Sequence, residues 1–199
     1  MPFARLHGGV ESAEDDGWSA PVDAPWELTD GVVRLRRWRP DDAEWIHGVC
    51  QDAEIQRWTR IPVPYTRADA EWFVDVFVPQ AWDRGEEFHL VATDVATDAR
   101  LGSVGLVLVP GAPGVGEVGY YTAPEGRNQG VASASVDLVA AWAFGVLGLV
   151  RLELHIDPRN TPSLAVARRC GFELEGILRS RAEHRGARRD VALHARLQS

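Results

Sequence analysis

The sequence lacks lysine entirely, so all 21 of its basic residues are arginine. It has two cysteines, Cys50 and Cys170, which are too few for a disulfide framework and fit a reducing cytoplasm. The most apolar stretch, residues 136–150, contains Asp137 and two glycines and is too short to span a bilayer. The N-terminal residues also lack the apolar core of a secretory signal peptide. These absences predict a cytoplasmic protein without a membrane segment.

The charge is distributed unevenly between the two halves of the chain. With 29 acidic and 21 basic residues the formal net charge is -8. Residues 1–99 carry 9 arginines against 20 acidic side chains (-11), whereas residues 100–199 carry 12 arginines against 9 (+3). The negative balance argues against binding to a nucleic-acid backbone, which requires a basic surface. An anionic small ligand would bind in the second half, although ordinary solvated faces explain the charges more simply.

Motifs of several enzyme classes are missing as well. Without lysine the chain cannot form a Walker-type phosphate loop. It has no Cys-x-x-Cys or His-Glu-x-x-His, and His155 and His184 lack partners at metal-ligand spacing, so we expect no metal site. Residues 114–119 match the G-x-G-x-x-G dinucleotide pattern, but that fingerprint must open a helix. Tyr120 and Tyr121 instead continue a strand, which excludes the dinucleotide interpretation.

The length and composition suit one globular domain with an appendage. The chain has 199 residues, of which 45% are hydrophobic and 25% charged, enough for a sizeable core. Residues 1–30 contain an acidic run with glycine, serine and proline, and we expect a partly irregular appendage there. Within it, Trp18 and Trp26 are apolar enough to attach the segment to the domain. We expect the domain to cover residues 31–199.

Hydrophobic periodicity predicts a mixed α/β layer architecture. The predicted strands are residues 32–38, 87–93, 101–109, 117–122, 151–156, 172–178 and 191–197. The predicted helices begin at residues 40, 66, 131 and 161. The second helix opens with Thr66 and Asp69 in a capping-box pattern. It then carries an apolar stripe that we expect in the core, formed by Trp72, Phe73, Val76 and Phe77.

The segment from residue 125 to residue 133 lies between a predicted strand and the longest predicted helix. Gly130 and Ala132 are small enough for the backbone to approach a ligand closely. The first N–H groups of the helix and its dipole favour an anion, and Arg127 adds a full positive charge. These features suit a diphosphate, but the residues alone are equally compatible with an ordinary strand-to-helix turn.

The run Arg127-Asn128-Gln129-Gly130-Val131-Ala132 resembles the Gln/Arg-x-x-Gly-x-Gly/Ala signature of the GNAT acyl-CoA N-acyltransferases. Downstream, residues 151–163 and 170–176 resemble the next strand, the Asn-x-x-Ser turn and the Gly-Phe element of that family. Residues 34–43 and 189–191 look like the RimJ/RimL branch, which includes ribosomal-protein N-terminal acetyltransferases. The likeness covers about residues 32–197, and the ordered set of motifs is more specific than the signature alone.

This resemblance implies a single GNAT domain of the α/β class. Its mixed, mostly antiparallel central sheet would splay in the middle at a bulge, with helices on both faces and acetyl-CoA in the opening. The backbone of Val118, Gly119 and Tyr120 would hold the pantetheine and thioester. The pyrophosphate loop would consist of Arg127, Asn128, Gln129, Gly130, Val131 and Ala132. Asn160 and Ser163 would lie near the thiol end.

Acetyl transfer needs a deprotonated amine, a hydrogen-bond donor for the oxyanion and a proton donor for the leaving thiolate. A backbone N–H of residues 117–120 is the candidate oxyanion donor. The resemblance assigns the proton donor to Ser163, because the tyrosine that many relatives carry one helical turn later is Ala167 here. A helix-capping role for Ser163 is equally open. Glu117 and Glu183 are candidate bases, although each also suits a structural role, and the loop of Glu183 is one residue shorter than in RimL-type relatives.

The resemblance implies an acetyl-CoA-dependent N-acetyltransferase that acts on a primary amine. One acceptor class is a protein N-terminal α-amine, whose pKa near ~8 could let it react without a strong base. The other is a small amine, such as an amino sugar, an amino acid or a polyamine. Outside enzymes, the alternative is a non-catalytic acyl-CoA-binding module. We expect no nucleic-acid or membrane partner, and a monomer or a homodimer.

Overall fold

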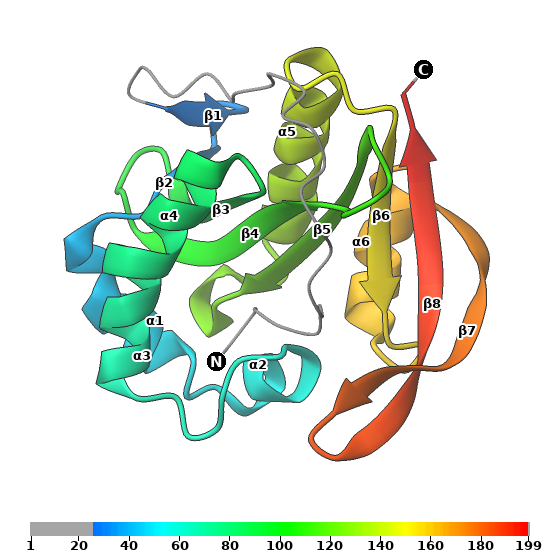
Figure 1. The fold of residues 1–199 in the computed structure, drawn as a ribbon. Coiled ribbons are helices and arrows are strands. Elements are labelled where there is room, and N and C mark those ends of the chain that lie inside the picture. Colours follow the sequence, from blue (N-terminus) through cyan, green and yellow to red (C-terminus); the bar gives the residue numbers. More distant parts are fainter. Residues whose placement is uncertain (1–25, 199) are drawn as a thin grey trace.

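The computed structural model describes residues 26–198, which form one eight-stranded sheet with helices on both faces (Figure 1). The strand order is β1-β2-β3-β4-β5-β6-β8-β7, and neighbours pair antiparallel except for the parallel pair β5 and β6. The strands are β1 (Glu27–Thr29), β2 (Val33–Arg37), β3 (Glu87–Asp94), β4 (Arg100–Leu108), β5 (Val115–Thr122), β6 (Arg151–Ile156), β7 (Glu173–His184) and β8 (Ala187–Leu197).

The helices are α1 (Ala43–Val49), α2 (Ala53–Trp58), α3 (Arg67–Trp72), α4 (Val78–Arg84), α5 (Val131–Gly145) and α6 (Thr161–Arg169). Three short turns complete them: η1 (Pro40–Asp42), η2 (Phe73–Phe77) and η3 (Pro124–Gly126). In Figure 1, α5 and α6 lie behind the sheet, while α1, α2, α3 and α4 lie toward the viewer. The mixed, mostly antiparallel α/β fold with helices on both faces is therefore confirmed.

The sheet begins before residue 31, the expected start of the domain. Trp26 contacts Trp82 and Trp142 edge to face, with ring centroids 5.0 and 4.5 Å apart. Directly after it, β1 pairs with β2. Trp26 therefore attaches the first described residues to the core, whereas residues 1–25, with Trp18, lie outside the described part of the chain.

The helical segment that begins at Thr66 contains a π turn that the sequence pattern did not predict. Its capping box is confirmed, because Thr66 Oγ1 accepts from the Asp69 N–H at 3.2 Å and Asp69 Oδ2 accepts from the Thr66 N–H at 2.8 Å. The π turn η2 changes the angle between successive residues relative to an α-helix. As a result Phe73 is buried, whereas Trp72 and Val76 are 39% and 38% exposed, so only part of the expected apolar stripe reaches the core.

The last two strands are longer than the sequence pattern predicts. They extend toward each other and form a hairpin that ends at His184 and Ala187. The apolar side chains from which the sequence pattern predicted these strands lie in the parts near β6. Residues 179–190, in the extended parts, are mostly charged. Within residues 26–198, no helix combines the length and apolar character needed to cross a membrane.

A buried ion cluster fixes the position of α1 on the sheet. The Asp42 carboxylate, which is fully buried, accepts from Arg36 Nη1 at 2.8 Å, from Arg36 Nη2 at 3.0 Å and from Arg100 Nε at 2.6 Å. Burial by itself would raise the pKa of Asp42, but the hydrogen bonds from both arginines outweigh it and lower that pKa from 3.8. The cluster joins β2, η1 and β4, so the turn that leads into α1 is held from both strands.

Candidate functional site

The parallel strands β5 and β6 separate after a short ladder. They pair at three positions, of which the last joins Glu117 to Glu153. Beyond that point β5 continues to Thr122 and β6 to Ile156 without pairing with each other. In the described sheet, the shifts of register lie in the pairs β3–β4 and β7–β8. We expected a bulge at the point where the central strands separate, and no register shift lies between β5 and β6 there. The opening leaves backbone groups of both strands available to a ligand.

The three residues predicted to hold pantetheine border this opening. Val118, Gly119 and Tyr120 follow directly after the last paired position of β5. The Val118 side chain is buried in the core, which fixes the strand, while Gly119 is exposed and presents only backbone. A Cβ added to Gly119 would meet nothing within 4 Å among the atoms of residues 26–198.

The predicted pyrophosphate loop stands at the N-terminus of α5. Gly130 is the N-cap of that helix and has a φ of 81°, a left-handed conformation that favours glycine. The first hydrogen bond of the helix runs from the Ala134 N–H to the Gly130 carbonyl at 3.0 Å. The N–H groups of the first helical turn therefore have no partner inside the helix. They belong to Val131, Ala132 and Ser133.

The loop before Gly130 has a fixed shape. Asn128 has a φ of 61°, and Gln129 Nε2 donates to the Glu125 carbonyl at 2.6 Å. A Cβ on Gly130 would meet nothing within 4 Å, so the space in front of α5 is free of described protein atoms. A short, open loop at the positive end of a 15-residue helix can hold an anion with its backbone N–H groups.

Arg127, the cationic residue of the loop, is paired with Asp52. Arg127 Nη2 donates to Asp52 Oδ1 at 2.5 Å, and the same carboxylate oxygen caps α2 by accepting from the Ile55 N–H at 2.9 Å. The hydrogen bond from Arg127 lowers the pKa of Asp52 from 3.8. The Arg127 side chain is 35% exposed, so a ligand can reach it. The sequence did not predict this pair, because Asp52 is distant in the chain.

Ser163 and Tyr120 meet across the splay. The Ser163 Oγ and the Tyr120 hydroxyl oxygen lie 2.8 Å apart. Burial raises the pKa of Tyr120 to about 12, and the hydrogen bond with Ser163 only partly opposes this effect. Asn160 is the N-cap of α6 and accepts from the Ser163 N–H at 3.2 Å. Ser163 thus lies in the first turn of α6, where the helix-capping role was expected. The cap itself is Asn160, and the Ser163 hydroxyl contacts the Tyr120 hydroxyl instead.

Glu117 lies in a charged network at the start of the opening. Its Oε2 is 3.3 Å from His155 Nδ1, and its Oε1 is 3.5 Å from Arg60 Nη2. The other ring nitrogen of His155, Nε2, lies 2.9 Å from Glu153 Oε2. A neutral imidazole has one N–H and can donate to only one of these carboxylates, whereas the imidazolium donates to both.

Glu183, the other candidate base, is not brought next to Glu117. It lies on β7, with an exposed side chain, and β8 separates its strand from β6. The tip of this hairpin instead contacts α2, where Arg185 Nη2 donates to the Gln56 carbonyl at 2.6 Å. Asp52, the N-cap of α2, binds Arg127. The helix therefore contacts both the predicted pyrophosphate loop and the hairpin.

The sequence pattern missed His155, Arg60 and Asp52. His155 had a local signal, since it alternates with the buried residues Leu154 and Ile156 and must therefore face the other side of the sheet. Its partner Glu117 is on a different strand, and only the register of the parallel ladder brings the two together.

Comparison with known proteins agrees with this geometry. The family described as Acetyltransferase (GNAT) domain matches residues 33–173. The chain is 28% identical over 149 residues to the spermidine N(1)-acetyltransferase of Escherichia coli, which covers 73% of this chain and 75% of that protein. It is 25% identical over 168 residues to an uncharacterized N-acetyltransferase of Bacillus licheniformis, with 83% and 93% covered.

Among solved structures, RimJ of Mycobacterium smegmatis in complex with CoA-disulfide superposes with a TM-score of 0.78. The sequence identity is 24%, and the match covers 87% of this chain and 88% of that one. This neighbour is consistent with the RimJ/RimL-like branch. The family match over most of the chain, together with the splayed strands and the loop at α5, shows that the protein belongs to the GNAT family and is an N-acetyltransferase.

Proposed function

We propose that this protein transfers an acetyl group from acetyl-CoA to a primary amine, and that a protein or peptide N-terminal α-amine is the first acceptor class to consider. The observation that carries the proposal is the splay between β5 and β6, which joins three features. The uncapped N-terminus of α5 lies at one end, the Ser163–Tyr120 pair lies across it, and Glu117 lies where the strands part.

The residues of the loop fit the diphosphate of acetyl-CoA. Free N–H groups of Val131 and Ala132 and the positive end of α5 would bind the phosphate oxygens. Arg127 would add a charge-assisted hydrogen bond, for which the diphosphate would compete with Asp52. The backbone of Gly119 would pair with the pantetheine arm, because its face of the strand is open and unpaired. Asn160, at the start of α6, would border the thiol end.

The proton of the acceptor amine would leave through Glu117. A primary α-amine has a pKa near ~8, so part of it is already neutral at physiological pH, and a modest base suffices. Glu117 would accept the proton directly or through water, and His155 would hold the carboxylate in place. The amine nitrogen then attacks the thioester carbonyl, and a backbone N–H of β5 would donate to the developing oxyanion. Glu183 is the less favoured base because nothing joins it to the opening.

The leaving thiolate would take its proton from the Ser163–Tyr120 pair. The C–S bond breaks as the C–N bond forms, so the sulfur gains the electron pair and requires a proton. With the pKa of Tyr120 raised to about 12 by burial, the hydroxyl stays protonated at neutral pH and can donate. Tyr120 would thereby supply the phenol that many relatives carry at the position of Ala167.

Two alternatives follow from the comparisons and from the site. The relative from Escherichia coli is a spermidine acetyltransferase, so a polyamine is the main small-molecule acceptor to test. A module that binds acyl-CoA without turnover is the other, because the loop at α5 would serve either role.

Release of CoA thiol, followed with an aromatic disulfide, tests the proposal on the full chain with acetyl-CoA. The acceptors are an N-terminal serine peptide amide, the same peptide with a blocked α-amine, and spermidine. We expect turnover with the free peptide and none with the blocked one. Faster turnover of spermidine would replace the first acceptor class by the second. Binding of acetyl-CoA without turnover on any amine would establish the non-catalytic module and overturn the proposal.

Site variants test the assigned roles in the same assay. We expect Glu117→Gln to lower kcat by about tenfold to a thousandfold and to leave the affinity for acetyl-CoA nearly unchanged. Tyr120→Phe should lower kcat more than Ser163→Ala if the phenol is the donor that contacts sulfur. Glu183→Gln is the matched control for Glu117→Gln, and an equal loss in both variants would contradict the choice of base.

A further inference from the structure

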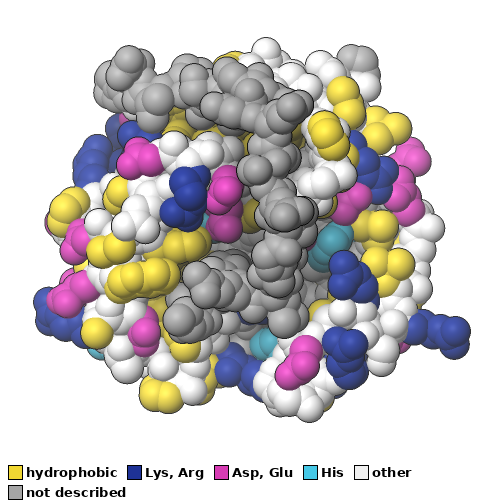
Figure 2. All heavy atoms as spheres, viewed as in Figure 1, with side chains coloured by type: hydrophobic (Ala, Val, Ile, Leu, Met, Phe, Trp, Pro, Cys, Tyr) yellow, Lys and Arg dark blue, Asp and Glu magenta, His cyan; other side chains and the backbone are white. Residues whose placement is uncertain are grey.

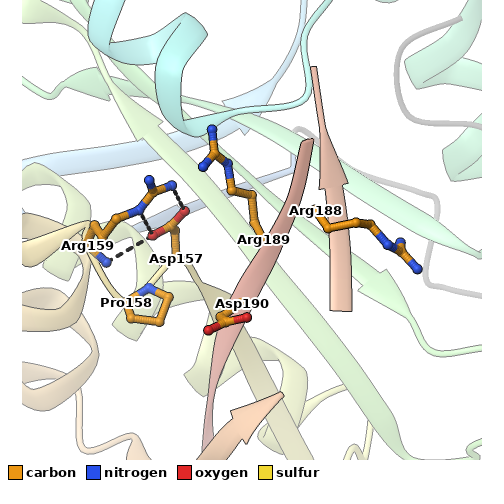
Figure 3. Close-up of a pocket in the computed structure, with 6 residues that line it drawn as sticks. All are labelled: Asp157, Pro158, Arg159, Arg188, Arg189 and Asp190. Atoms are coloured by element: carbon orange, nitrogen blue, oxygen red, sulfur yellow. Dashed lines mark hydrogen bonds and ion pairs between the residues drawn. The ribbon is translucent and has the colours of Figure 1, made fainter. Parts of the chain in front are cut away.

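A small polar pocket lies between the end of β6 and the β7–β8 hairpin. Its volume is about 280 Å³. The lining residues are Asp157, Pro158, Arg159, Arg188, Arg189 and Asp190 (Figure 3). Basic side chains also gather on this part of the surface, at the lower right of Figure 2. The charged lining residues are three arginines and two aspartates.

Both carboxylates of the pocket already have partners. Asp157 accepts from Arg159, from Nε at 2.8 Å and from Nη2 at 2.5 Å, and the hydrogen bond from Arg159 lowers the pKa of Asp157 from 3.8. Asp190 Oδ1 accepts from the Ser180 N–H at 2.8 Å. Arg189 is different, because its Nε is a buried atom with no hydrogen-bond partner in the described part of the chain. Arg189 is therefore the guanidinium that can still bind an anion.

The two neighbouring arginines of β8 point in different directions. Figure 3 shows Arg189 directed into the space beside Asp157, toward the helix coloured as α2, while Arg188 extends away from it. This follows from the strand, in which successive side chains lie on opposite faces. Only Arg189 is thus placed to contact a ligand in the pocket.

The pocket lies next to the proposed base. His184 is close enough to both Asp157 and Arg189 for their charges to act on it, and its ring contacts the backbone at Arg57 of α2. Three residues after Arg57, Arg60 contacts Glu117. Asp157 lies directly after the end of β6, two residues after His155. The pocket and Glu117 are therefore both linked to the segment of α2 and the residues that follow it.

We propose that Arg189 forms an anion subsite for the acceptor, and that the preferred acceptors carry a carboxylate or phosphate close to the reacting amine. This inference rests on the proposed function and narrows its substrate class. An acidic side chain on the residue after an N-terminal amine is one acceptor group of this kind. A polyamine would instead place a second cation beside Arg189, which is unfavourable.

Matched acceptor peptides test this subsite. The probes are Ser-Glu-Ala-Ala amide and Ser-Gln-Ala-Ala amide, which differ only in the charge at the second position. We expect kcat/KM to be about tenfold higher for the acidic peptide, the effect of one partly exposed charge-assisted hydrogen bond. In Arg189→Gln this ratio should fall toward one, and in wild type it should fall as salt is raised. Arg188→Gln is the matched control and should keep the ratio.

The 3′-phosphate of the acetyl donor is the other anion that could use Arg189. Repeating the assays with acetyl-dephospho-CoA separates the two sources. If Arg189→Gln raises the KM for acetyl-CoA but not for the dephospho form, and the peptide ratio is unaffected, the pocket binds the donor and the proposal is wrong. Turnover of both peptides at equal rates, or a preference for spermidine, also overturns it. These results differ from failure of the proposed function, in which no amine is acetylated at all.

Discussion

Two arginine–aspartate pairs in different regions of the molecule use the same chemistry in opposite ways. Arg36 and Asp42 are 3% and 0% exposed, in the sealed half of the sheet formed by β1 to β4. Arg127 and Asp52 are 35% and 21% exposed, beside the opening between β5 and β6. The first carboxylate is satisfied by two arginines and a backbone N–H, whereas the second shares one arginine with a helix cap.

The difference teaches what burial does to an ion pair. A buried pair that loses one partner leaves a charge without compensation, so the sealed pair is a fixed part of the fold. An exposed pair contributes little to stability, because water can replace either partner. The pair at the opening is therefore free to exchange its carboxylate for another anion, which is the property that a binding site needs.

The largest effect should come from breaking the sealed pair. We expect Asp42→Ala to lower the free energy of unfolding by about 3–5 kcal/mol, because buried Arg36 would lose its hydrogen-bonded carboxylate and keep only Asp98, 3.8 Å from its Nε. Denaturant unfolding followed by tryptophan fluorescence measures this loss. Asp41→Ala is the control, since Asp41 is 70% exposed and its pair with Arg100 should contribute less than about 1 kcal/mol. A loss for Asp42→Ala no greater than for the control would contradict the comparison.

Acid should weaken the sealed pair in a defined direction. The folded-state pKa of Asp42 lies below 3.8, so its carboxylate form is the one that the fold stabilises. Its contribution is fully present above that unfolded-state value and is lost as the pH falls through the lower folded-state pKa. We expect the free energy of unfolding to fall with acidification below about pH 4, and Asp42→Asn to show a smaller slope there. Unfolding curves from pH 5 down to pH 2 measure both slopes.

A smaller effect on the fold but a clear one on binding should follow from reversing the charge at the opening. We expect Arg127→Glu to weaken acetyl-CoA binding by about tenfold to a hundredfold, because the variant replaces a charge-assisted donor by a repelling carboxylate. Calorimetric titration measures the affinity. Arg84→Glu is the control, since Arg84 pairs only with the neighbouring Glu86 on the surface. Unchanged affinity in Arg127→Glu would remove the pyrophosphate assignment.

Removing the Asp52 carboxylate, which competes with a ligand for Arg127, should strengthen acetyl-CoA binding, and by a smaller factor than Arg127→Glu weakens it. Asparagine can still cap α2, so Asp52→Asn removes the charge and keeps the cap. We expect acetyl-CoA to bind up to about fivefold more tightly, since a pair of this exposure is worth at most about 1 kcal/mol. Weaker binding in this variant would show that Asp52 positions Arg127 for the ligand instead of competing with it.

The smallest effect concerns the two thiols, which are both buried. Burial raises the pKa of Cys50 to about 12 and that of Cys170 to about 11. Because only the thiolate reacts, neither should be alkylated by iodoacetamide in the native protein at pH 8, while both should react after unfolding. Mass spectrometry of the labelled chain measures this. Native labelling of Cys170 alone would show that its surroundings exchange with less ordered states more readily than those of Cys50.

The sequence was most informative where local patterns repeat. The capping box at Thr66 and the positions of most strands follow from residue spacing, and both are confirmed. The loop before α5 was also predicted in its place, from the family signature, and its pyrophosphate role stays a prediction. It was least informative at the ends of β7 and β8 and in the π turn, because neither has an apolar period of its own. His155 was visible as a polar residue on an apolar strand, but its role depends on Glu117.

By itself the sequence determined the family, the α/β class and the segments that border the opening, because these depend on periodicity and on motifs within about ten residues. Only the tertiary structure decided which charges meet. It paired Arg127 with Asp52, placed His155 between Glu117 and Glu153, and left Arg189 Nε buried with no hydrogen-bond partner among residues 26–198. The physical reason is that an ion pair depends on distance in space and on burial, and both are set by strand register and helix packing.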